Sequence, residues 1–135
     1  MSEPAPRYGA EEAMEKLLEG NREYVRTGLH SAEIGEDVRL RTASKGQFPY
    51  AVIITCSDSR VIPTAAFNAG IGDLFIIRSA GNIVDGCTLG SVEYAVEHLG
   101  CRLVVVLGHT HCGAIKSTLE GPQTGPVAFI TEEIR

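Results

Sequence analysis

The sequence predicts an α/β fold in which a mostly parallel central sheet is flanked by helices. Three short, uninterrupted apolar runs predict buried strands at residues 51–55, 74–77 and 103–107. Segments with helical spacing of apolar residues separate these runs, as in the crossover connections of a parallel sheet. We therefore expect helices to cover both faces of the sheet and ligands to bind beyond the carboxyl ends of its strands.

The segment before the first strand predicts two helices. Residues 1–9 contain two prolines and little apolar content, which predicts a mobile arm or an arm that docks on a partner. Residues 10–26 have the spacing of an amphipathic helix. A second, shorter helix is expected within residues 33–46, with Val38 and Leu40 as its main apolar contacts.

The rest of the chain alternates helical segments with the two later strands. Thr88 is the expected N-cap of the helix that follows the second strand, and residues 79–82 are expected to form a loop. Helical segments are predicted at residues 61–68, 89–99, 114–119 and 127–135. Nothing marks a repeat or a second domain, so residues 1–135 are predicted to form one domain.

Composition excludes several classes of function. A net charge of −5 with scattered basic residues argues against a nucleic-acid partner. The apolar runs are far shorter than the ~20 residues of a membrane span, and the first residues lack the regions of a secretory signal. We expect a cytoplasmic protein. Four cysteines in a reducing compartment are expected to serve metal binding or chemistry rather than disulfides.

Two thiols and an imidazole follow the ends of predicted strands. Cys56 follows the first strand, and His109 and Cys112 follow the third. This set matches a zinc site with three protein ligands and one open position. His111 is interpreted as an exposed loop residue or a proton carrier. Two other interpretations stay open at this point: ordinary buried cysteines with a hydrogen-bonded histidine, and a closed structural site with Asp58 as fourth ligand.

Asp58 and Arg60 lie on one side of an extended segment and can pair as carboxylate and guanidinium. The pair is either a plain surface ion pair or a device that orients a nucleophile beside zinc. If Arg60 releases Asp58, the carboxylate can reach the metal and close the site. Because two thiolates neutralise zinc, we expect bound water with a pKa above the ~7 of three-histidine sites, and activity that rises toward alkaline pH.

Several ordered motifs resemble the β-class carbonic anhydrases. They run from the first helix to the third strand: Leu18-Leu-Glu-Gly-Asn21, Gly46-Gln-Phe-Pro49, Cys56-Ser-Asp-Ser-Arg-Val61, Gly72-Asp-Leu-Phe-Ile-Ile-Arg78, Ala80-Gly-Asn82, Ser91-Val-Glu-Tyr-Ala-Val96 and Gly108-His-Thr-His-Cys-Gly113. The resemblance implies reversible hydration of carbon dioxide to bicarbonate and a proton, by attack of zinc-bound hydroxide.

The resemblance also implies roles for residues. It assigns one zinc ion per chain to Cys56, His109 and Cys112, with Asp58 as a ligand only in a closed state. Asp58 and Arg60 become the catalytic pair. The residues implied to bind substrate, in a pocket shared by two subunits, are Gln47, Phe75, Tyr94 and Gly113. A homodimer or larger homo-oligomer is implied, with the N-terminal helical arm wrapped around the partner subunit.

Family members usually continue beyond the position of Arg135 with further helices and an edge strand. This short C-terminus makes a zinc-binding protein without turnover one alternative to hydration. A second alternative is hydrolysis of carbonyl sulfide or carbon disulfide at the same site, because the resemblance includes relatives that hydrolyse these molecules. Outside the motifs, Cys87 and Cys101 are expected to be small packing residues. His30 and His98 are expected to be surface side chains.

Overall fold

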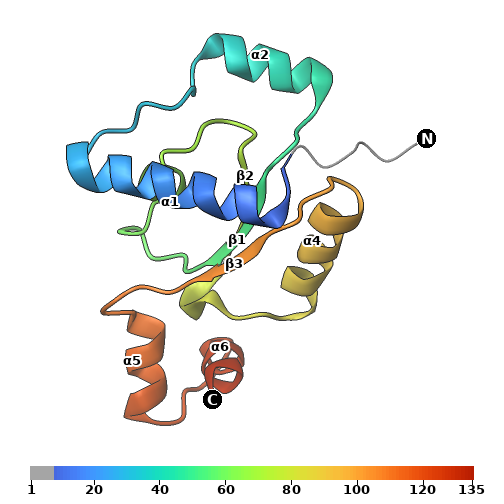
Figure 1. Ribbon diagram of the computed structural model, residues 1–135. Coiled ribbons are helices and arrows are strands. Elements are labelled where there is room, and N and C mark those ends of the chain that lie inside the picture. Colours follow the sequence, from blue (N-terminus) through green and yellow to red (C-terminus); the bar gives the residue numbers. More distant parts are fainter. Residues whose placement is uncertain (1–7) are drawn as a thin grey trace.

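Three parallel strands form the centre of the structure, a computed structural model that describes residues 8–135 (Figure 1). The strands are β1 (Ala51–Thr55), β2 (Leu74–Arg78) and β3 (Val104–Leu107). Their order is β2-β1-β3, with β1 paired in parallel to both neighbours. The predicted parallel α/β sheet is confirmed, and the carboxyl ends of all three strands point toward one edge.

Within residues 8–135, six α-helices and one short 3₁₀ turn connect and flank the strands. They are α1 (Ala10–Thr27), α2 (Glu36–Lys45), α3 (Pro63–Ala66), the 3₁₀ turn η1 (Ala80–Asn82), α4 (Gly86–Glu97), α5 (Gly113–Glu120) and α6 (Val127–Ile134). Figure 1 shows α1 and α4 on opposite sides of the sheet, and α5 and α6 together beyond the strand ends.

The core divides into two layers because neighbouring residues of a strand point to opposite faces. Ile53 of β1 belongs to a cluster with Ala13 and Leu17 of α1. Val52 belongs to a second cluster that includes Ala95 of α4. Every residue of β1 is buried, as its continuous apolar run predicts for a central strand covered on both sides.

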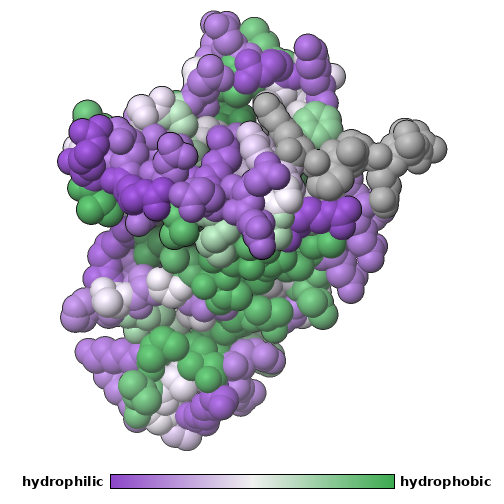
Figure 2. Space-filling view, in the orientation of Figure 1, coloured by the Kyte–Doolittle hydropathy of each residue, from purple (hydrophilic) through white to green (hydrophobic). Residues whose placement is uncertain are grey.

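Coverage of both faces was predicted for the whole sheet, and β3 contradicts that prediction. Val104 and Val106 are 40% and 59% exposed, because α4 packs on β1 and β2 and no described element covers this face of β3. Figure 2 shows apolar surface over the sheet and again over α5 and α6. The predicted contact of Leu40 is also wrong, since this side chain of α2 is 62% exposed, whereas Val38 is buried.

The predicted N-cap and first residue of α4 are wrong. Asp85, and not Thr88, is the N-cap: its Oδ1 accepts a hydrogen bond from the backbone N–H of Thr88 at 2.8 Å, and the helix begins at Gly86. The predicted loop at residues 79–82 contains the 3₁₀ turn η1.

The predicted mobile arm falls largely on residues 1–7, outside the described range. None of the helices within residues 8–135 has the length and apolar character needed to cross a membrane.

Candidate metal centre

Parallel pairing brings the loops after β1 and β3 to the same edge of the sheet. Thr55, the last residue of β1, pairs with Leu107, the last residue of β3. Cys56 follows Thr55 directly, and His109 follows Leu107 after one glycine. The strands therefore bring a thiol and an imidazole to neighbouring positions, although 52 residues of sequence lie between them.

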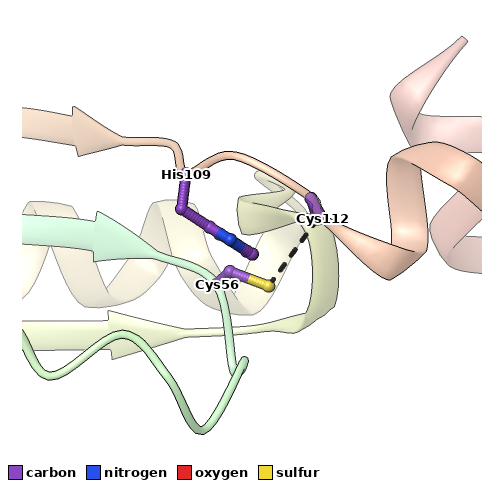
Figure 3. Close-up of side chains that lie close together, drawn as sticks. All are labelled: Cys56, His109 and Cys112. Carbon is purple, nitrogen blue, oxygen red and sulfur yellow. Dashed lines mark hydrogen bonds between the residues drawn. The ribbon is translucent and has the colours of Figure 1, made fainter.

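Cys56, His109 and Cys112 converge at this edge. Their candidate ligand atoms all lie within 4.8 Å of one another, the one such group of histidine, cysteine and acidic residues within residues 8–135. The two Sγ atoms are 4.0 Å apart, and Figure 3 shows the His109 ring pointing into the space beside them. Two thiolates bound to one tetrahedral zinc ion at ~2.3 Å would be ~3.8 Å apart, so the donor set fits zinc.

The tautomer of His109 favours the same interpretation. Its Nδ1 lies 2.8 Å from the carbonyl oxygen of Thr110, which can only accept a hydrogen bond. Nδ1 of the neutral ring therefore carries the proton, and Nε2 carries the lone pair. Nε2 is buried and has no hydrogen-bond partner among the described atoms. A buried acceptor without a partner is costly, and a metal ion would satisfy it.

The surroundings of Cys56 favour its thiolate. Burial raises the pKa of this thiol, but the adjacent imidazole of His109, the backbone N–H groups of Asp58 and Gly81, and the neighbouring thiol of Cys112 together lower it to about 7. The neighbouring Cys56 in turn raises the pKa of His109 above its ordinary value, against the effect of burial. Zinc binds thiolate rather than thiol, so the loops prepare a ligand in its binding form.

Asp58 is held by Arg60 beside this cluster. Arg60 donates from Nε to Oδ1 at 3.0 Å and from Nη2 to Oδ2 at 2.7 Å, and its backbone N–H donates to Oδ1 at 2.9 Å. These hydrogen bonds hold the pKa of the Asp58 carboxyl well below its usual range. Oδ2 also lies 3.8 Å from Nε2 of His109. The carboxylate is thus next to the ligand group while bound to the guanidinium.

Known proteins with this sequence pattern are carbonic anhydrases. The sequence model of the family described as carbonic anhydrase matches residues 51–135. Carbonic anhydrase of Mycolicibacterium smegmatis is 42% identical over 116 residues, which are 85% of this chain and 55% of that protein. Carbonic anhydrase 2 of Mycobacterium tuberculosis is 42% identical over 113 residues, which are 84% of this chain and 54% of that protein.

Solved structures agree with the sequence comparison. A Coccomyxa β-carbonic anhydrase in complex with acetazolamide has a TM-score of 0.68 at 31% identity, over 88% of this chain and 54% of that chain. The chain belongs to the β-carbonic anhydrase family. A tetrameric β-carbonic anhydrase of Sordaria macrospora has a TM-score of 0.64 at 29% identity, over 88% of this chain and 61% of that chain. The chain spans about half the length of the curated relatives it matches.

In this β-carbonic anhydrase chain, Arg78 holds the loop that carries Cys56 and Asp58. Its Nε donates to the carbonyl of Cys56 at 3.0 Å, and its Nη2 donates to the carbonyls of Asp58 at 2.8 Å and Val61 at 2.9 Å. Sequence reasoning gave Arg78 no role. The sequence did contain a signal: Arg78 is a single cationic residue at the carboxyl end of an apolar strand. This strand, β2, pairs with β1, which ends directly before Cys56.

The residues that the carbonic anhydrase resemblance assigns to substrate lie in two places. Gly113 is the first residue of α5, immediately after Cys112. Gln47 lies before β1, whereas Cys56 lies after it, and the five residues of β1 span ~17 Å. Phe75 lies near the amino end of β2, with its ring centroid 6.1 Å from that of Tyr94. The chain therefore brings these two rings together but places them and Gln47 away from its own Cys56.

The remaining histidines and cysteines give mixed outcomes. Cys101 is 1% exposed, as expected of a packing residue, but Cys87 is exposed in the first turn of α4, so its packing prediction is wrong. His98 is exposed. His30 is half-buried with Nε2 2.6 Å from the carbonyl oxygen of Ala69, so it is not the surface side chain predicted. His111 is exposed and outside the ligand group, and its role in proton transfer stays a prediction.

Proposed function

We propose that this chain catalyses the zinc-dependent reversible hydration of carbon dioxide to bicarbonate and a proton. The observation that carries the proposal is the convergence of Cys56, His109 and Cys112, with Nε2 of the histidine buried and without a hydrogen-bond partner in the part of the chain that the structure describes. Membership of the β-carbonic anhydrase family supports the choice of substrate. Residues 1–135 are proposed to act as one domain, in the cytoplasm.

In this proposal the three ligands hold one zinc ion per chain and leave its fourth position open. Zinc would act as a Lewis acid that activates water for attack on carbon dioxide. The two thiolates of Cys56 and Cys112 offset the charge of the ion, which weakens that activation compared with three-histidine sites. We therefore expect the hydration rate to rise between pH 6 and pH 9. A flat profile over this range would contradict the assignment of two thiolate ligands.

Asp58 is proposed to orient the nucleophile and accept a hydrogen bond from it. Support comes from its position, with Oδ2 3.8 Å from the candidate ligand atom of His109, and from its bidentate pairing with Arg60. Arg60 is further tied by Nη2 to the carbonyl oxygen of His111 at 3.1 Å, which restricts the guanidinium. Release of Asp58 from Arg60 would let the carboxylate reach the metal as a fourth ligand and stop the reaction.

The substrate pocket is proposed to lie between two subunits of a homodimer or larger homo-oligomer. Gln47, Phe75 and Tyr94 would then serve the partner's metal centre, while Gly113 would serve the metal centre of its own chain. The remoteness of Gln47 from its own Cys56 supports this division. Exposed apolar side chains on α1 also support a subunit interface, in which this helix would wrap the partner.

The test combines metal analysis with a stopped-flow hydration assay on the 135-residue chain and on Cys112→Ser. The parent chain should bind one zinc ion and hydrate carbon dioxide, and the variant should lose both properties. Full zinc occupancy in the variant would overturn the ligand assignment. Stoichiometric zinc without hydration from pH 6 to pH 9 would instead indicate a zinc-binding protein, and faster turnover of carbonyl sulfide or carbon disulfide would indicate a hydrolase.

A further inference from the structure

The turn η1 brings a backbone N–H group to one of the two cysteine ligands. The N–H of Gly81 donates to Sγ of Cys56 with an N···S distance of 3.2 Å, in a buried position. The strand ends fix this contact, because Ser57 donates its N–H to the carbonyl of Ser79, and Ser79 donates to that of Thr55, both at 3.2 Å. The Gly81 amide thus has a defined place relative to the sulfur.

Glycine is required at this place for two reasons. Its φ of 73° lies in the left-handed region, where a side chain costs conformational energy. A Cβ atom at position 81 would also lie 2.7 Å from Cδ1 of Ile134 and 3.1 Å from Cβ of Ala114. A side chain here would therefore have to displace α5, α6 or the amide itself.

The helices that close on Gly81 are connected to the metal centre. Cys112 is the N-cap of α5, so this helix begins at the second cysteine ligand. Ala114 lies in the first turn of α5, and Ile134 lies in α6, which packs on both α5 and η1. One small residue therefore contacts the sulfur of Cys56 on one side and the two helices after Cys112 on the other.

We propose that Gly81 is a positioning residue for the metal: its N–H donates to the Cys56 thiolate, and Ile134 and Ala114 leave no room for a side chain at this position. Such a hydrogen bond withdraws electron density from sulfur and fixes the direction of its lone pairs. The inference rests on the proposed zinc site. It adds a backbone donor and a contact with α6 that the motifs of the ligand loops do not contain.

The first test leaves the sequence unchanged. The protein is labelled with nitrogen-15 and loaded with cadmium-113 in place of zinc, and the amide proton of Gly81 is examined by NMR. An N–H···S–Cd contact should transmit a scalar coupling between this proton and cadmium. Bound cadmium without a coupling to Gly81 overturns the inference alone. Failure of the parent chain to bind cadmium or zinc overturns the proposed function itself.

The second test uses Gly81→Ala, with Gly28→Ala as its matched control. Gly28 has a similar φ of 66° at the end of α1, with no atom within 4 Å of an added Cβ, so it tests backbone strain alone. Gly81→Ala should bind zinc about 10–100-fold more weakly, the usual effect of losing a hydrogen bond to a ligand. In the cobalt form, its sulfur-to-cobalt absorption band should move to longer wavelength. Gly28→Ala should keep the parent's zinc affinity and band position.

A rescue variant separates the contact with α6 from backbone strain. Ile134→Ala removes the atom nearest to an added Cβ, Cδ1 at 2.7 Å, so the double variant Gly81→Ala with Ile134→Ala should regain most of the lost zinc affinity. Ile134→Ala alone should bind zinc like the parent chain. Parent-like affinity and absorption in Gly81→Ala would overturn the inference. If Gly81→Ala does not fold, the cadmium coupling of the parent chain decides.

Discussion

The two ends of strand β1 each have a buried cysteine nearby, and their thiols have opposite properties. Cys101 is 1% exposed and Cys56 is 4% exposed. Beyond the amino end, Cys101 donates from Sγ to the carbonyl oxygen of Pro49 at 3.0 Å, and burial raises its pKa to about 11. Beyond the carboxyl end, hydrogen bonds lower the pKa of Cys56 to about 7 in spite of burial.

The difference shows that burial alone does not determine what a cysteine can do. Cys101 meets an acceptor, so its proton is retained and the residue packs as a small apolar group. Cys56 meets donors, among them the N–H of Gly81, so its negative charge is stabilised. Loops that follow adjacent parallel strands supply such donors at the carboxyl edge, and the candidate metal centre lies there.

Serine substitution at Cys56 and at Cys101 should give the largest difference in zinc affinity between two variants. Cys56→Ser replaces a thiolate ligand by a weakly binding hydroxyl group, and we expect zinc affinity to fall by at least ~100-fold and hydration to be lost. Cys101→Ser keeps a donor for the carbonyl of Pro49, so zinc binding should persist, with a loss of about 1 kcal/mol in the free energy of unfolding. Zinc competition titrations and urea unfolding measure these effects. Equal loss of zinc in both variants would contradict the comparison.

Asp58 should affect turnover without affecting zinc binding. Asp58→Asn keeps the size of the side chain but removes the charge that accepts hydrogen bonds from Arg60 and from the nucleophile. We expect the rate constant of hydration to fall ~100-fold, with zinc affinity close to that of the parent. Glu33→Gln is the matched control, because Glu33 also pairs with an arginine, Arg41 at 3.1 Å, on the exposed surface. A full hydration rate in Asp58→Asn would remove Asp58 from the proposed mechanism.

Substitution of Arg78 should show how far the loop that carries Cys56 and Asp58 depends on the hydrogen bonds from this side chain. Arg78→Lys leaves a single ammonium group where a guanidinium reaches three carbonyl oxygens, those of Cys56, Asp58 and Val61. We expect a loss of about 1–2 kcal/mol in the free energy of unfolding, together with slower hydration because Asp58 is held less firmly. Arg39→Lys, on the exposed surface of α2, serves as control. Unchanged stability and hydration in Arg78→Lys would show that the loop keeps its conformation without the clamp.

The strands and the ligand residues were predictable from sequence because both have a strong residue-type signature. Apolar runs predicted the strands, and the positions of Cys56, His109 and Cys112 after two of them predicted that these three side chains converge. The N–H group of Gly81 could not be predicted, because every residue except proline has this donor and only the fold decides where it points. The three hydrogen bonds of Arg78 could not be predicted for a similar reason, because their acceptors are backbone carbonyl groups, which every residue has.

The wrong predictions for the N-cap of α4 and for the burial of β3 came from sequence signals that fit more than one structure. Both Asp85 and Thr88 are good N-cap residues, and the backbone conformation selected the earlier one. The apolar run of β3 resembles that of β1, yet only β1 has a strand on each side and a helix on each face. The exposure of Val104 and Val106 therefore depends on what lies beside the strand, which its own sequence does not encode.

The smallest expected effect is the pH dependence of the two thiols in the metal-free protein. Because folding lowers the pKa of Cys56 from about 8.5, its contribution to stability should be complete above that pH and lost as the pH falls through 7. Folding raises the pKa of Cys101, so its contribution is present below pH 8.5 and lost as the pH rises toward 11. The stability difference between parent and Cys56→Ser should thus grow from pH 6 to pH 9.

Alkylation with iodoacetamide, followed by peptide mass spectrometry, gives a second measure of the same contrast. Exposed Cys87 should react first and serves as an internal reference. The reaction of Cys56 should reach half its maximal rate near pH 7, because the thiolate is the reactive form. Cys101 should stay unmodified until the protein unfolds. If Cys56 instead titrated near 9, or Cys101 reacted as readily, hydrogen-bond donors would not be what separates the two thiols.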